Sequence, residues 1–223
     1  NKKIQIIKIN HSKNFDIQKN KFSYLSKIQN YDYFIYLAHD YSKYSAKNNI
    51  NILKKINQHK RNKNKRIIYI SSMSAHKNNQ SRYGKSKFEI EKFCIKEKIL
   101  IIRPGYIFGG KKNYKHEKII KVLNFFPIIP LYKNYSNFIY SVEINELNNE
   151  IYKILKLKKI KYHSLNIFNK KKIYFDHFLK NLRKQNKIYL NINFKLYLIF
   201  IRIINKIFNL KFFDSLLSFM TAK

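Results

Sequence analysis

The sequence has 223 residues but contains no tryptophan, one cysteine, three prolines and four glycines. A single cysteine, Cys94, excludes an internal disulfide and a zinc site built from several cysteines. No histidine lies at an informative spacing from it, so a buried structural thiol is favoured over a nucleophile. All glycines lie at or after Gly84, so no glycine-rich phosphate loop precedes that residue in this sequence.

Acidic residues are also scarce, with 12 Asp and Glu against 47 Lys and Arg, which gives a net charge of +35. Such a charge is typical of proteins that bind nucleic acid or an anionic membrane. However, Lys, Asn, Ile, Tyr and Phe are abundant together, which favours codon bias from an A- and T-rich genome as the cause. No aromatic RNA-binding signature accompanies the charge. The charge therefore does not assign a function by itself.

Long hydrophobic runs are missing as well, and none approaches the ~20 residues of a membrane-spanning helix. Residues 188–223 are rich in Leu, Ile and Phe, but lysine and arginine interrupt them, at Lys195, Arg202, Lys206 and Lys211. A helical tail packed on the body or on a second copy is favoured. A basic amphipathic helix lying on a membrane is the alternative. No signal-peptide pattern is found, so a cytoplasmic location is expected.

Short apolar runs alternate with longer amphipathic segments along the chain. The pattern predicts strands at residues 4–9, 34–38, 67–70, 99–102 and 164–167, and helices at 42–59, 83–96, 118–126, 142–155 and 174–182. An extended piece is expected between Pro127 and Pro130. Continuous apolar strands separated by helices indicate an α/β fold with a parallel sheet covered on both faces. Ala38, Ser72 and Pro104 should then share the edge where ligands bind.

A serine, a tyrosine and a lysine follow these strands at an informative spacing. Ser72 comes directly after the apolar run 67–70, and Tyr83 and Lys87 lie four residues apart at the start of a predicted helix. Residues four apart share a helix face. A cation beside a phenol favours the phenolate, which is the better proton acceptor near neutral pH. The serine hydroxyl could hydrogen-bond the same reacting oxygen.

In this order, several segments resemble the extended short-chain dehydrogenase/reductases, and among them the NAD-dependent epimerase/dehydratase family that acts on nucleotide-sugars. The segments are residues 31–39, 70–75, 83–87, 102–109, 140–147 and 164–168. The resemblance covers roughly residues 30–182. It implies a Rossmann-type doubly wound parallel sheet lacking its first β-α unit, with a small C-terminal substrate lobe. The implied division is an NAD-binding domain at 1–110, a substrate lobe with closing helices at 111–187 and the tail at 188–223.

The resemblance also implies a role for each matching residue. Tyr83 would be the general acid/base, Lys87 would hold the nicotinamide ribose and favour the phenolate of Tyr83, and Ser72 would bond the reacting oxygen. The residues implied to contact the cofactor are Leu37, Ala38, His39, Ser71, Tyr83, Lys87, Pro104 and Gly105. Those implied to contact the substrate are Ser72, Ser74 and Tyr106. No metal site is expected.

The function expected from the resemblance is an oxidoreductase that uses NAD, with NADP as an alternative, to epimerise, dehydrate or reduce a nucleotide-sugar. A homodimer through the helices 42–59 and 83–96 is also expected. The sequence shows no Gly-x-x-Gly-x-x-Gly turn, which we interpret as truncation of a working enzyme. The competing hypothesis is a degenerate, non-catalytic protein of this fold that binds RNA or an anionic membrane surface.

Overall fold

The computed structural model describes residues 31–40, 42, 44–58, 66–79, 81–109, 124–131, 138–157, 159–160, 163–170, 173–174, 177, 188–193, 195–197, 199–200 and 203–204. The strand expected at residues 4–9 and the polar loop expected at 111–117 lie outside these residues. So does most of the helix expected at 118–126, of which residues 124 and 125 are helical.

Four parallel strands form the main sheet, in the order β1-β2-β3-β8. They are β1 (Tyr33–Tyr36), β2 (Arg66–Ile70), β3 (Leu100–Pro104) and β8 (Ser164–Ile167). Ile35 pairs with Ile68, and Tyr69 with Ile101. The predicted parallel sheet is confirmed, and the strand ends differ from the predicted ones by no more than two residues.

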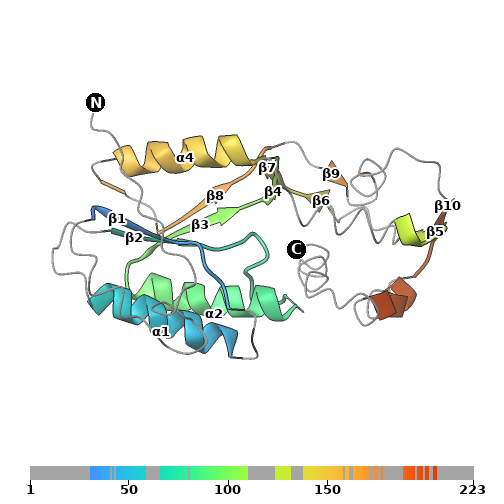
Figure 1. Cartoon of the computed structure of the whole chain (residues 1–223), viewed down its shortest axis with the longest axis horizontal. Coiled ribbons are helices and arrows are strands. Elements are labelled where there is room, and N and C mark those ends of the chain that lie inside the picture. Colours follow the sequence, from blue (N-terminus) through green and yellow to red (C-terminus); the bar gives the residue numbers. More distant parts are fainter. Residues whose placement is uncertain are drawn as a thin grey trace.

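Helices cover both faces of this sheet (Figure 1). The helices α1 (Ser45–Gln58) and α2 (Arg82–Lys96) lie on one face, and α4 (Ile144–Lys156) lies on the other. Side chains alternate along each strand, so Ile67 and Tyr69 pack with α1 and α2, whereas Ile68 and Ile70 pack with α4. This two-sided burial explains why the strands are apolar without interruption, and it confirms the doubly wound architecture.

Cys94 lies in the core between α2 and the sheet and is fully buried, as predicted for a structural thiol. Burial raises the pKa of this thiol, and the nearby Glu91 carboxylate raises it further. The thiolate is therefore disfavoured, which argues against a nucleophilic role.

Beyond the sheet, the chain forms three pairs of short strands. Strand β4 (Tyr106–Phe108) pairs in parallel with β7 (Ser141–Glu143), and β6 (Phe138–Ile139) pairs antiparallel with β9 (Ile173–Tyr174). Strand β5 (Ile128–Leu131) pairs in parallel with β10 (Ile188–Asn191). The extended piece predicted between the two prolines is therefore confirmed as part of β5.

The structure corrects three of the predicted helices. The helix predicted from residue 142 begins at Ile144, because Val142 and Glu143 belong to β7. Tyr174, predicted to start a helix, ends β9 instead. The tail predicted to be helical from residue 188 begins with β10, because Ile188–Asn191 find a partner strand in β5. In each case a distant pairing partner decides the conformation, which a local pattern does not contain.

A search of the described residues finds no helix both long and apolar enough to cross a membrane. Likewise, within these residues no cluster of three or more His, Cys, Asp and Glu side chains could hold a metal ion.

Candidate active site

The predicted site lies at the carboxyl edge of the sheet, where β2 ends. The Ser71 amide donates to the Ile102 carbonyl of β3 at 2.7 Å, which continues the sheet pairing by one residue. The chain then turns so that the Ser72 and Ser74 hydroxyls lie 2.8 Å apart, and the Ser74 amide donates to the Ser72 hydroxyl at 3.2 Å. Both serines are buried. The Ser72 hydroxyl is thus held in one orientation at the end of the strand.

Lys87 connects helix α2 to this strand end. Its side chain is only 2% exposed, and its Nζ donates to the Ile70 carbonyl at 2.8 Å. The same Nζ lies 4.7 Å from the centre of the Tyr69 ring and 5.7 Å from that of Tyr83. A buried ammonium is costly unless it is hydrogen-bonded or paired, and the Ile70 carbonyl supplies such a hydrogen bond here.

Tyr83 lies in the first turn of α2, one turn before Lys87. Its ring packs edge-on against the ring of His39, with 4.9 Å between the centroids. His39 follows β1, so this contact joins the ends of two strands and the start of one helix. The structure therefore brings together Tyr83, Lys87 and His39, and Lys87 connects them to the end of β2, next to Ser72.

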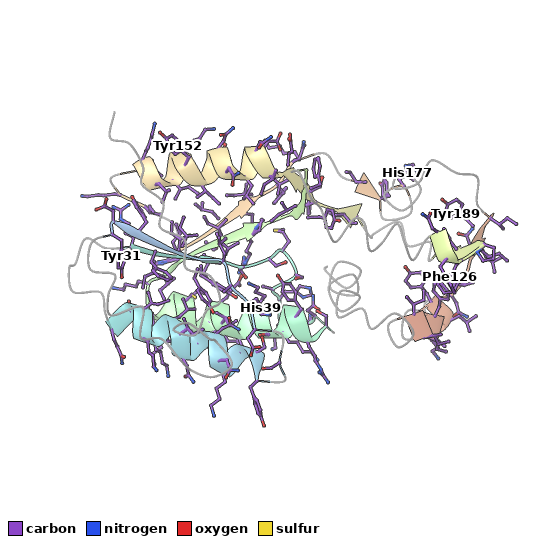
Figure 2. All side chains as sticks on the ribbon, in the orientation of Figure 1. Tyr31, His39, Phe126, Tyr152, His177 and Tyr189 are labelled. Carbon is purple, nitrogen blue, oxygen red and sulfur yellow. The ribbon has the colours of Figure 1, made fainter. Side chains whose placement is uncertain are left out.

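The Tyr-x-x-x-Lys spacing alone does not create this environment. Helix α4 carries another such pair, Tyr152 and Lys156, with Nζ 4.2 Å from the ring centre. Both of its residues are exposed, and Tyr152 lies on the far side of the sheet from His39 (Figure 2). The pair Tyr83 and Lys87 on α2 differs from the pair on α4 because Lys87 is buried at the end of a strand.

Asn79 organises the loop between Ser72 and Tyr83, a role that the sequence did not suggest. Its side chain is fully buried and donates to the Ser74 carbonyl at 2.8 Å. Its carbonyl oxygen accepts from the Ser81 amide at 2.8 Å and from the Ser81 hydroxyl at 2.7 Å. The Ser81 hydroxyl in turn accepts from the Gly84 amide at 2.9 Å and caps α2. Asn79 therefore ties the serine turn to the helix that carries Tyr83.

We expect Gly84→Ala to disrupt this loop. A Cβ at Gly84 would lie 2.3 Å from the Asn79 side-chain carbon, so Asn79 must move and lose its hydrogen bonds. The expected loss of stability is about 2 kcal/mol, measured by urea unfolding. Asn79→Ala removes the obstacle, so the double variant should be less destabilised than the sum of the two single variants. Additive effects would show that Gly84 and Asn79 do not interact in this way.

His39 is held as a neutral base behind Tyr83. Burial and the positive charge of Lys87 lower the pKa of His39 to about 3, although the Asp40 carboxylate opposes the shift. The Nε2 atom lies 3.3 Å from the Ser45 hydroxyl, which also contacts the Ser86 hydroxyl at 2.7 Å and donates to the Asp40 carbonyl. A neutral imidazole can pack against the Tyr83 ring without bringing a second positive charge next to Lys87, and the expected contact of His39 with the cofactor stays a prediction.

The low pKa of His39 predicts a pH-dependent loss of stability. The unfolded chain takes up a proton near pH 6.5, whereas the folded chain resists it until about pH 3. The stabilisation is therefore complete above pH 6.5 and is lost as the pH falls towards 3, by roughly 3–5 kcal/mol in total. His39→Asn should flatten this part of the stability curve relative to His177→Asn, an exposed control. Parallel curves for the two variants would contradict the assignment.

The residues assigned to the cofactor lie along the same edge. Leu37 is 70% exposed at the end of β1, although a leucine at this position would ordinarily be covered. The Ser71 hydroxyl is buried and has no hydrogen-bond partner among the described residues. Ala38 is half-buried and Pro104 is buried. Leu37 thus leaves an apolar side chain uncovered at this edge, and Ser71 leaves a buried hydroxyl unsatisfied; their contacts with a cofactor stay a prediction.

Gly105 and Tyr106 are held mainly by packing. A Cβ at Gly105 would lie 2.5 Å from the Tyr140 carbonyl oxygen, so glycine is required there whether or not a cofactor is bound. Tyr106 is buried in β4, and burial raises the pKa of its phenol to about 12. Its predicted contact with a substrate stays a prediction.

A buried ion pair lies one turn further along α2. The Arg103 Nε donates to one Glu91 oxygen at 2.8 Å, and a second guanidinium nitrogen donates to the other oxygen at 2.6 Å. This pairing raises the pKa of Arg103, chiefly through the hydrogen bonds to Glu91. Glu91 is four residues after Lys87, so the spacing Tyr83, Lys87, Glu91 was a usable signal that the sequence interpretation missed. The ion pair between Glu91 and Arg103 therefore holds α2 against β3, one helical turn after Lys87.

Comparison with solved structures identifies the class of fold. The structure has the fold of the NAD-dependent epimerases, dehydratases and reductases of the extended short-chain dehydrogenase/reductases. The expected resemblance is therefore confirmed at the level of the fold. No family model and no curated protein matches the sequence itself.

Three solved structures illustrate the likeness. UDP-N-acetylglucosamine 4-epimerase from Bacillus cereus is 18% identical with a TM-score of 0.55, over 76% of this chain and 68% of its own. UDP-glucuronic acid 4-epimerase from the same organism, bound to UDP-glucuronic acid and NAD, is 19% identical with a TM-score of 0.60, over 80% and 67%. dTDP-4-dehydrorhamnose reductase from Bacillus anthracis, in complex with NADP, is 16% identical with a TM-score of 0.61, over 83% and 75%.

Proposed function

We propose that this chain belongs to an NAD(P)-dependent oxidoreductase that acts on a nucleotide-sugar. The observation that carries the proposal is the buried ammonium of Lys87, held by the Ile70 carbonyl beside the Tyr83 ring at the carboxyl edge of a parallel sheet. The exposed Leu37 and the buried Ser71 hydroxyl provide a surface for the cofactor on the same edge. The fold is shared with enzymes whose structures hold NAD or NADP and UDP-sugars.

In the proposed reaction, Tyr83 takes the proton from a sugar hydroxyl and later returns one to the keto oxygen. Lys87 stabilises the phenolate that this requires and holds the nicotinamide ribose. The Ser72 hydroxyl, oriented by Ser74, bonds the reacting oxygen. The bound nicotinamide supplies the hydride chemistry. Neutral His39 supports the Tyr83 ring without adding a second positive charge to the site.

Further parts of the proposal follow the same resemblance. Residues 1–110 would bind the cofactor, residues 111–187 would bind the substrate, and residues 188–223 would form the tail. The protein would be cytoplasmic.

A homodimer would form through α1 and α2, which pack side by side and leave the exposed Ile95 of α2 on the outer surface. Light scattering on the purified chain measures this directly, and a monomer at all concentrations would remove the dimer from the proposal.

The test of the proposed function uses the chain with added NAD or NADP and a panel of UDP-, dTDP- and ADP-linked hexoses. We expect at least one sugar to reduce the bound nicotinamide transiently, seen as fluorescence of the reduced cofactor. A chain that binds NAD but gives no reduction with any sugar would favour the non-catalytic alternative. That alternative is tested further by RNA binding, which must weaken steeply as salt rises if phosphate contacts drive it.

A further inference from the structure

A small lobe at the C-terminal end of the chain exposes large apolar side chains. We define the C-terminal lobe as Phe126, β5, β10 and the helical residues between 195 and 204 that the structure describes. Figure 2 places Phe126 and Tyr189 in this lobe, at the end of the molecule away from α1 and α4. The ring of Phe126 packs edge-on against that of Phe200 at 5.3 Å, which joins the start of β5 to the helical residues.

The two strands of the lobe have one covered face and one exposed face. Ile188 pairs with Ile128, and Leu190 is two residues further along β10, so these three side chains point to the same face. All three are exposed, Ile188 to 66% and Leu190 to 55%. Ile129, which points to the opposite face, is buried. The strand pair therefore presents an uncovered apolar face.

The helical residues between 195 and 204 that the structure describes also have one buried side and one exposed side. Tyr197 and Ile204 are buried, and Phe200 joins them at spacings of three and four residues. Leu196, Ile199 and Ile203 form a second stripe with the same spacing, and each is at least half exposed. The first stripe faces the start of β5 through the contact of Phe200 with Phe126, and the second stripe is left exposed. Exposed apolar patches of this kind mark interaction surfaces.

The sequence of this segment carries charge of one sign. Lys195 is exposed next to Leu196. The sequence between 186 and 211 contains five basic residues, Lys187, Lys195, Arg202, Lys206 and Lys211, and no acidic residue. The whole chain carries a net charge of +35. Charges of this density repel a second copy of the same surface, whereas they attract an anionic lipid headgroup layer.

We propose that the C-terminal lobe docks on an anionic membrane surface, with Ile188, Leu190, Leu196, Ile199 and Ile203 inserted at the headgroup boundary. This combines an apolar stripe beside the exposed Lys195 with a basic sequence, as in helices that lie in the interface plane. Electrostatic attraction brings the lobe to the surface and apolar insertion holds it there. The inference is independent of the proposed nucleotide-sugar chemistry, since none of these residues belongs to the site at the sheet edge.

The chain contains no tryptophan, so Leu196→Trp introduces a single fluorescent reporter. We expect its emission to shift to shorter wavelength with vesicles of phosphatidylcholine and phosphatidylglycerol, and brominated lipid to quench it. Leu157→Trp, at an exposed position after α4, is the control and should not shift. Pure phosphatidylcholine vesicles should give little binding to either variant, because the electrostatic attraction is missing.

A second measurement separates insertion from attraction by charge alone. Leu190→Ser with Ile199→Ser should weaken co-sedimentation with the anionic vesicles at least about tenfold, because two apolar side chains lose their burial while the net charge stays the same. Leu157→Ser should not weaken it. Equal binding by all variants would overturn the proposal. So would a dimer in light scattering that the double variant dissolves while vesicles bind neither protein, since the apolar surface would then be a contact between copies.

Discussion

Tyr83→Phe is expected to lower turnover of the nucleotide-sugar by about 10²–10⁴-fold, because the variant keeps the ring and loses the proton acceptor. The ring contact with His39 at 4.9 Å needs no hydroxyl, and neither does the hydrogen bond from Lys87 to Ile70. The fold should therefore persist, with a change in the free energy of unfolding below about 1 kcal/mol. Steady-state kinetics and a urea unfolding curve on the same preparation test both parts.

The matched control for this variant is Tyr152→Phe. Tyr152 belongs to the exposed Tyr-x-x-x-Lys pair on α4, with Lys156 above its ring. Its substitution should leave turnover unchanged, since neither residue lies at the strand ends. Full activity of Tyr83→Phe would remove the acid/base role from the proposal. Cofactor binding measured on both variants separates loss of chemistry from loss of the cofactor.

Glu91→Ala is expected to destabilise the protein by about 3 kcal/mol. The side chain of Glu91 is 2% exposed, and its removal leaves the Arg103 guanidinium, 27% exposed, without its two hydrogen bonds. Breaking one partner of a buried pair costs about 3–5 kcal/mol, and the partial exposure of Arg103 sets the lower end. Because the pair fixes α2 to β3, turnover should fall as Lys87 loses its position relative to Ile70.

Helix α2 offers a control for this prediction as well. Glu89 forms an ion pair with Lys92 at 2.8 Å, but these side chains are 52% and 56% exposed. Glu89→Ala should change stability by less than about 0.5 kcal/mol. Replacing both buried partners, as Glu91→Leu with Arg103→Met, should recover part of the loss because no charge is left buried. Similar effects of Glu89→Ala and Glu91→Ala would contradict the structural role of the buried pair.

Much of the fold followed from local pattern. The apolar runs at 67–70 and 99–102 need no distant partner to be recognised, because burial on both faces makes every residue of such a strand apolar. Helix α2 was equally clear, including its end at Lys96, and the structure adds only its first residue, Arg82, and its cap, Ser81. Long periodic segments and continuous apolar runs can be recognised from the sequence alone, whereas short strands without such a pattern, such as β7, β9 and β10, form only where a partner strand is present.

Some residues of the candidate site could likewise be recognised from the sequence, and others only from the structure. Ser72, Tyr83 and Lys87 could be found from residue type, order and spacing. Asn79 could not be assigned, because an asparagine in a loop is ordinary until its partners are known. The spacing of Glu91 after Lys87 indicated a shared helix face, but it did not reveal the partner of Glu91. Asn79 acquires its role from contacts with Ser74 and Ser81, and Glu91 from Arg103.

The sequence by itself therefore determined the parallel sheet, the strand ends at which a ligand can bind and the chemical types gathered there. Only the tertiary structure decided that the pair on α2 is buried and the pair on α4 exposed, that His39 is neutral behind Tyr83, and that residues 188–191 pair with β5 as a strand. The physical reason is that spacing fixes which side chains share a face, whereas burial and charge environment depend on elements far away in the chain.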